Sequence, residues 1–246
     1  PLLTGSIAAI LLAWCGLLLR LRNESLAALS YAQAGGLGIV AAPLLGLATL
    51  PGALLGAAAA ALLKPWLARS ADGLIVLLLA TWGLSLLLLA NLPSGEHVGR
   101  MMIDGQLYFT RLEHTLGLAI GLALASILLP GLTRSIQRER LFPARPASRM
   151  QNLKIEFMLA GSLALAAASL GVMAAFALAF LPARIAFRLT SRWSHALMLA
   201  LGLAAHLVAF FLALHFDQPY GPVLTLTLLI ASYATTWLKT QPRQSA

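Results

Sequence analysis

The sequence is poor in charged residues, and poorest in acidic ones. Only 10% of its 246 residues are charged, and Asp and Glu together number eight. A water-soluble domain carries about 25% charged residues. In contrast, 60% of the residues are hydrophobic, and apolar runs of about 20 residues recur along the whole chain. The shortage of charge therefore excludes a soluble globular domain and predicts a multi-pass membrane protein.

Several kinds of functional motif are also missing. The single cysteine, Cys15, excludes an intramolecular disulfide. The chain contains no G-x-x-x-x-G-K-[ST] motif for nucleotide phosphates, no H-E-x-x-H zinc motif and no G-x-S-x-G nucleophile motif. We therefore predict no enzymatic activity and no cofactor in this chain. If the protein's activity is driven by ATP, we expect ATP and Mg²⁺ to bind to a partner subunit.

The apolar residues predict helices rather than a membrane β-barrel. Leu and Ala dominate, and no ten-residue alternation of polar and apolar residues is present. The predicted fold is an all-α transmembrane bundle that forms one domain over residues 1–246, with about nine membrane segments that include short, broken helices. The segments are expected at 2–19, 26–47, 51–63, 74–92, 114–129, 155–170, 172–187, 194–214 and 221–238.

Basic residues set the predicted orientation. The net charge is +9, and with the C-terminus inside, 15 of the 17 Lys and Arg residues fall on inner connectors. Merging the segments at 155–170 and 172–187 would break this pattern, so two short segments are expected to meet near Gly171. A pair of short segments suits a pore-lining element. The basic residues thus indicate contact with anionic lipid and the cytoplasm rather than with nucleic acid.

The last third of the chain carries a family resemblance. The residues concerned are Gly171-Val172, Ala177-Leu178 and Pro182-Ala183, followed by a turn with Asp217, Pro219, Gly221 and Pro222. This order resembles the permease subunits of metal-ion ABC importers, the zinc and manganese uptake systems. The resemblance implies a homodimer in the bacterial cytoplasmic (inner) membrane, two cytoplasmic ATPase subunits and an extracytoplasmic metal-binding protein.

Polar residues within the apolar segments are candidates for the translocation path. They are Ser30, Tyr31 and Gln33 in the second segment and His206 in the eighth. The alternative for each is ordinary hydrogen bonding between helices. Family members carry G-D-A-L-S-H-A where this chain has residues 26–32, so Ala27 replaces an Asp and Tyr31 replaces a His. The metal ligands are therefore unknown, and a metal chelate, a metal that passes without this site, and a divergent branch all remain open.

Acidic residues and a histidine gather on the predicted outer side. They are Glu96, His97, Asp104, Glu113 and Asp217. We expect them to dock the binding protein, because residues 101–107 resemble a short L-F-G-D-L-L helix of the family. A weak metal-collecting surface and a plain solvated face are the alternatives.

A basic connector is expected at residues 133–154, on the inner side. In the family, a short coupling helix at this position enters a groove of the ATPase subunit. The residues expected to make that contact are Phe142, Ala144, Arg145, Ser148 and Arg149. A basic loop that lies on lipid headgroups is the alternative.

Two other functions stay open at this point. A secondary transporter driven by an ion gradient would need an acidic residue within the membrane. An integral-membrane enzyme or assembly factor would need His, Asp or Cys residues gathered near one interface, and Glu113-His114 with His97 is the nearest approach to such a group.

Overall fold

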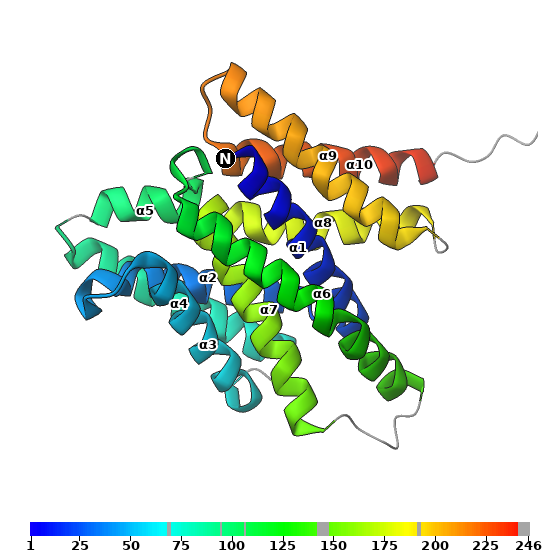
Figure 1. Ribbon diagram of the computed structural model, residues 1–246, viewed down its shortest axis with the longest axis horizontal. Helices are drawn as coiled ribbons and strands as arrows, with labels where there is room; N and C mark the ends of the chain where they lie inside the picture. Colours follow the sequence, from blue (N-terminus) through cyan, green and yellow to red (C-terminus); the bar gives the residue numbers. More distant parts are fainter. Residues whose placement is uncertain (68–69, 94, 106, 142–147, 191–192, 241–246) are drawn as a thin grey trace, which may run out of the picture.

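The computed structural model describes residues 1–67, 70–93, 95–105, 107–141, 148–190 and 193–240. These residues form a bundle of crossing helices (Figure 1), and the described part of the chain contains no β-strand. The helices are α1 (Leu2–Arg22), α2 (Ser25–Ala41), α3 (Thr49–Leu67), α4 (Ala71–Asn91), α5 (Gly95–Asp104), α6 (Leu112–Leu141), α7 (Arg149–Leu170), α8 (Val172–Leu189), α9 (Ser194–His215) and α10 (Tyr220–Thr240), with short 3-10 turns η1 (Ala42–Leu45) and η2 (Leu107–Phe109).

The long helices confirm the predicted class, an all-α multi-pass bundle. Among the described residues, eight helices are long and apolar enough to cross a membrane. The last predicted segment forms α10, which packs against α8 and α9. The segment predicted at 26–47 is shorter as an α-helix, because α2 ends at Ala41 and η1 follows it. The sequence therefore predicted the order of the long helices, although nine membrane segments were expected and eight described helices meet this criterion.

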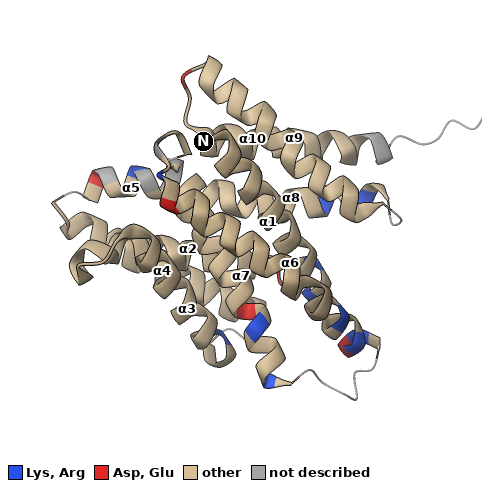
Figure 2. Ribbon diagram, viewed as in Figure 1, with Lys and Arg blue, Asp and Glu red and all other residues tan. Residues whose placement is uncertain are grey.

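Charge is divided between two ends of the bundle. Figure 2 shows most Lys and Arg toward the bottom and the right, at the end of α6, at the start of α7 and, higher up on the right, around the turn between α8 and α9, while α5 on the left also carries Arg100. Acidic residues of α5, of the start of α6 and of the α9–α10 turn lie on the upper left. This distribution agrees with the charge count, so the lower right end is the expected cytoplasmic side.

The break between α7 and α8 lies where the charge count placed it. Gly171 separates the two helices with φ 89° and ψ 158°, a backbone conformation that a residue with a Cβ rarely adopts. The helices on either side are longer than predicted, however. α7 has 22 residues and α8 has 18, and both are long enough to span the membrane. The structure therefore replaces the two short segments with two full helices joined by one residue.

Pro130 and Pro182 do not end the helices that contain them. Pro130 directly follows the segment predicted at 114–129 and Pro182 falls within the one predicted at 172–187, at positions where a proline can stop or kink a helix, yet both lie inside continuous helices, α6 and α8. Pro130 has no N–H to donate to the Ser126 carbonyl, and α6 nevertheless continues through this position. The good helix formers after Thr133 then carry α6 to Leu141. Most of the connector predicted at 133–154 is therefore helical.

Helices α2 and α3 pack backbone to backbone. A Cβ at Gly38 would lie 2.0 Å from the Gly52 carbonyl oxygen, and one at Gly56 would lie 2.3 Å from the Ala34 carbonyl oxygen. No side chain fits at such distances, so the close approach of the two helices depends on these glycines. This packing fixes α2 in the centre of the bundle, where α3, α4, α7 and α8 surround it.

We predict that Gly38→Ala lowers the stability of the folded protein. The added methyl meets backbone rather than a flexible side chain, so the helices must separate, at a cost of about 1–3 kcal/mol. The matched control is Gly83→Ala on α4, where a Cβ would meet nothing within 4 Å. Thermal unfolding in mild detergent, followed by the loss of monodisperse protein, compares the two variants. Equal melting temperatures would contradict the packing.

Candidate functional site

The polar residues of α2 differ in whether their side chains form hydrogen bonds with the rest of the protein. The Ser30 hydroxyl lies 3.1 Å from the Leu26 carbonyl oxygen and 3.0 Å from that of Leu74, so it ties α2 to α4. The Tyr31 hydroxyl donates to the carboxylate of Glu156 on α7. Gln33 is 6% exposed, yet its Nε2 has no hydrogen-bond partner among the described residues. Among the predicted path residues on α2, Gln33 is therefore the one whose buried hydrogen-bond donor is unsatisfied within the described residues.

His206 connects three helices near the outer end of the bundle. Its Nδ1 lies 2.7 Å from the Tyr220 hydroxyl on α10, and its Nε2 lies 3.2 Å from the Leu2 carbonyl oxygen on α1. A carbonyl only accepts, so Nε2 carries the proton and Nδ1 accepts from Tyr220. Gly5 leaves room for the ring, because a Cβ there would lie 2.1 Å from it. With both nitrogens engaged, His206 has the geometry of an interhelical hydrogen bond, and the structure does not bring it together with Ser30, Tyr31 and Gln33.

Four charged side chains form a buried ion cluster, made of Arg22, Glu24, Lys64 and Glu156. The Lys64 ammonium lies 2.7 Å from Glu156 and 2.5 Å from Glu24. The Arg22 guanidinium lies 2.8 Å from Glu156 and 3.1 Å from Glu24. Tyr31 adds its hydroxyl to Glu156, and its ring lies 5.9 Å from the Lys64 ammonium. The cluster thereby joins the end of α1, the start of α2, the end of α3 and the start of α7.

The ion cluster is balanced in charge and mostly closed to solvent. The side chains of Lys64 and Glu156 are 8% and 5% exposed, and those of Arg22 and Glu24 are 17% and 26% exposed. Two cations face two anions, so the cluster carries no net charge. Within the cluster, only Arg22 Nη1 is buried without a hydrogen-bond partner among the described residues. A buried charge without its partner is strongly unfavourable, so the four side chains depend on one another.

Sequence reasoning missed this cluster. Lys64 was taken as the residue that ends the third segment, whereas α3 continues to Leu67 and buries it. Glu156 lies within α7, inside a segment predicted to hold almost no charge. The sequence did contain a sign of a buried charge, because Glu156 is one of only eight acidic residues and lies directly after Ile155, inside a predicted membrane segment. Its partners come from three other helices, and their proximity is not visible in the sequence.

The predicted docking residues lie at the outer end, on separate elements. Glu96, His97 and Asp104 are on α5, Glu113 is in the first turn of α6, and Asp217 is in the α9–α10 turn with φ 51°. Glu96 forms an exposed ion pair with Arg100 at 2.5 Å. Near Asp217, a cavity of about 470 Å³ opens between η2 and the α9–α10 turn. The pKa of Tyr108 in this cavity is raised by burial and by the nearby Asp217.

The predicted coupling residues fall partly outside the described part of the chain. Phe142, Ala144 and Arg145 lie within residues 142–147, which are not described. Ser148 caps α7, where its hydroxyl accepts from the Gln151 N–H at 3.2 Å and the Gln151 side chain accepts from the Ser148 N–H. Arg149 is the first residue of α7. The segment between α6 and α7 is therefore shorter than the predicted connector.

No metal site is formed by the described residues alone. Among them, no group of three or more His, Cys, Asp or Glu side chains is placed to hold a metal ion. Tyr31 occupies the position of the expected His, and Ala27 is completely buried where the expected Asp would stand. The two replaced ligands thus sit in the packed interior, next to the ion cluster.

Comparison with known proteins identifies the fold. No protein-family model matches the chain, and no curated protein matches it. Among solved structures, the chain is similar to PsaBC from Streptococcus pneumoniae in complex with Fab, with a TM-score of 0.81. The superposition covers 99% of this chain and 92% of the matched chain at 18% sequence identity. The two chains therefore share one fold almost from end to end.

We predict that removing one charge from the ion cluster destabilises the protein and that removing two of opposite sign restores part of the loss. Glu156→Leu and Lys64→Met each leave an unbalanced buried charge, which costs about 3–5 kcal/mol. The double variant keeps the Arg22–Glu24 pair and is neutral again. Thermal unfolding in detergent measures all three, with Glu96→Ala at the exposed pair as the control. Additive losses in the double variant would show that the pair does not act as a unit.

Proposed function

We propose that this chain is the membrane-spanning permease subunit of an ABC importer for a divalent metal ion, zinc or manganese, or for a metal chelate. The fold carries the proposal, because the chain shares it with PsaBC over 99% of its length and the sequence resemblance implies the same fold. The segment from Gly171 to Pro222 supports the metal-ion class. The chain would work as a homodimer in a bacterial inner membrane, with ATP and Mg²⁺ bound by a separate cytoplasmic ATPase.

Helix α2 is the proposed path helix. It is surrounded by α3, α4, α7 and α8, and Gln33 offers a buried amide that no described residue uses. Outside it, α5 packs onto the same helix, since a Cβ at Gly36 would lie 2.9 Å from the Met102 sulfur. A binding protein docked at Glu96, His97, Asp104, Glu113 and Asp217 would therefore press on an element in contact with α2. His206 and Ser30, with their hydrogen bonds satisfied, would support the path rather than line it.

The inner end of the proposed path is the ion cluster. Tyr31 is one helical turn from Ala27 on α2, and it bonds to Glu156 where the family resemblance leads to a metal-binding His. A neutral, hydrogen-bonded phenol is a poor ligand for a bare divalent ion. Because Tyr31 stands in place of the expected His and bonds to Glu156, this position offers no ligand to a bare ion, which favours a chelated metal as the cargo. Movement of the segment between α6 and α7, driven by the ATPase, would reach the cluster through α7.

The buried Glu156 bears on the alternative of an ion-gradient-driven transporter. Such a transporter needs an acidic residue that takes up and releases an ion within the membrane. Glu156 is buried, but Arg22, Lys64 and Tyr31 occupy its oxygens. A carboxylate held by two cations has a structural explanation already. The absence of uptake after ATP depletion, with the ion gradients kept intact, would separate the importer from this alternative.

The first experiment is co-purification of the chain from its native gene cluster. The protein is extracted in mild detergent, and the intact complex is weighed by mass spectrometry. We expect a mass that fits two copies of this chain and two ATPase subunits. A stable species without an ATPase, made while the whole cluster is expressed, would overturn the importer assignment.

The second experiment tests the path. Gln33→Met keeps the side-chain length and removes the amide, and we expect it to lower metal uptake by about tenfold, since one polar contact with cargo corresponds to about 1.4 kcal/mol. The control is Ser169→Ala, a buried hydroxyl that bonds only within its own helix, to the Leu165 carbonyl oxygen at 2.9 Å. Uptake into proteoliposomes containing the complete complex is the measurement. If Gln33→Met transports like the wild type, α2 does not present Gln33 to the cargo.

A further inference from the structure

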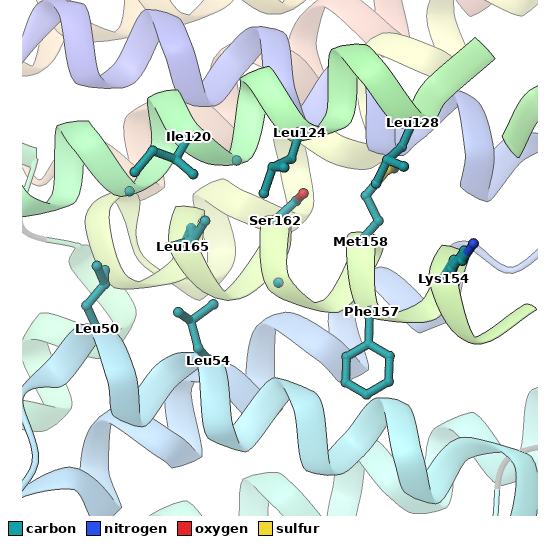
Figure 3. Close-up of a pocket in the computed structure, with 13 residues that line it drawn as sticks. Leu50, Leu54, Ile120, Leu124, Leu128, Lys154, Phe157, Met158, Ser162 and Leu165 are labelled. Atoms are coloured by element: carbon teal, nitrogen blue, oxygen red, sulfur yellow. The ribbon is translucent and has the colours of Figure 1, made fainter. Parts of the chain in front are cut away.

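Two cavities of similar size differ in their chemistry. The cavity between α3, α6 and α7 measures about 540 Å³, and Figure 3 shows it lined by apolar side chains, with Lys154 at one end. The cavity between η2 and the α9–α10 turn measures about 470 Å³, and its lining includes Tyr108, Asp217 and Gln218. Ligand pockets in proteins measure about 300–1,000 Å³. The second cavity therefore combines the size of a ligand pocket with groups that recognise a charged ligand.

Asp217 is the charged residue of this cavity, and its carboxylate is available. The side chain is exposed, and no described residue forms a salt bridge with it. Two other acids of the expected outer side are already paired, because Glu96 lies 2.5 Å from Arg100 and Glu113 lies 3.9 Å from Arg111. A cation that approaches from outside therefore meets an unpaired carboxylate at Asp217.

Tyr108 adds a phenol and an aromatic ring to the same cavity. Its hydroxyl oxygen is buried and has no hydrogen-bond partner among the described residues. Its ring packs against Phe210, with the ring centroids 5.7 Å apart. Burial raises the pKa of Tyr108 and the nearby Asp217 raises it further, so the phenol is neutral and accepts hydrogen bonds. A guanidinium donates several hydrogen bonds in one plane and stacks on aromatic rings, so it fits these groups better than an ammonium does.

Both walls of the cavity are held by backbone contacts. On the η2 side, Gly105 has φ 78°, and a Cβ there would lie 2.1 Å from the carbonyl oxygen of Leu170, at the end of α7. On the other side, the Gln218 N–H donates to the Ala213 carbonyl at 2.9 Å. A preformed cavity lowers the entropic cost of binding. A ligand in it also contacts backbone that rests directly on the junction of α7 and α8.

The charge of the expected outer side indicates what kind of partner docks there. Four acids and two bases give this side a net charge of −2. A docking surface is complementary in charge to its partner, and Arg is enriched among the residues that contribute most to binding. One carboxylate and one phenol are too few polar contacts to select a free cation. A side chain needs fewer contacts, because the rest of the docked protein positions it. The four acids are Glu96, Asp104, Glu113 and Asp217, and the two bases are Arg100 and Arg111.

We propose that the cavity between η2 and the α9–α10 turn receives one arginine side chain of the extracytoplasmic binding protein, whose guanidinium donates to the Asp217 carboxylate and the Tyr108 hydroxyl. This inference rests on the proposed function, because it requires a binding protein. Among the residues proposed for docking, Asp217 is then the one that belongs to a pocket. Through Gly105, the docked arginine contacts the segment that packs on the α7–α8 junction.

Asp217→Asn tests the pocket in the complete complex. Asn adopts a positive φ as readily as Asp, so the turn at φ 51° is kept while the charge is lost. The permease–ATPase complex is reconstituted in nanodiscs, and the binding protein from the same gene cluster is titrated by biolayer interferometry. We expect binding to weaken about tenfold. The matched control is Asp72→Asn, an exposed residue in the first turn of α4 on the expected inner side, which should bind like the wild type.

The outcomes separate this inference from the proposed function. Unchanged binding by Asp217→Asn would overturn the pocket and leave the importer intact, whereas a wild-type complex that binds no binding protein would overturn both. The mass of the intact Asp217→Asn complex is measured as well. If it holds one copy of this chain instead of two, the cavity is filled by the second copy, and the assignment to a binding protein is wrong.

A charge exchange identifies the arginine. Asp217→Arg places two cations in contact and should abolish binding. Each surface arginine of the binding protein is then replaced by aspartate, one at a time, and we expect one replacement to restore binding to Asp217→Arg. A misfolded variant could not be rescued in this way, so the exchange controls for folding. Failure of every replacement to restore binding would contradict the proposal. With the wild-type binding protein, Tyr108→Phe keeps the ring and should weaken binding about threefold, because it removes one neutral hydrogen bond.

Discussion

The expected inner end of this bundle depends on the neutrality of four charges, of which Lys64 and Glu156 are buried and Arg22 and Glu24 are partly buried. Arg22, Glu24, Lys64 and Glu156 come from four helices and are close enough to compensate one another. None of them is stable alone in an apolar interior. The cluster therefore requires α1, α2, α3 and α7 to meet in one register.

The other end of the bundle is held by neutral contacts. His206 ties α9 to α10 and α1 through hydrogen bonds on both ring nitrogens, and Met102 packs α5 onto α2 beside Gly36. Hydrogen bonds between helices in lipid are each modest, so this end can rearrange at lower cost than the ion cluster.

Helix α2 connects these two ends. Its glycines allow α3 to approach backbone to backbone, Tyr31 reaches the ion cluster, and Gln33 keeps an unused donor between them. Tyr31 forms a structural bond to Glu156, and Gln33, two residues further along the same helix, keeps a buried amide donor that no described residue accepts.

Composition and charge pattern by themselves determined the class of the protein, the order of its long helices, the break at Gly171 and the expected cytoplasmic side. These follow from local physics, because apolar length, glycine and basic flanks each act on one segment at a time. Only the tertiary structure decided the extent of α6 and α7, the partners of His206, and the burial of Lys64 beside Glu156. Residues distant in sequence meet through helix packing, and neither hydropathy nor spacing records which faces pack together.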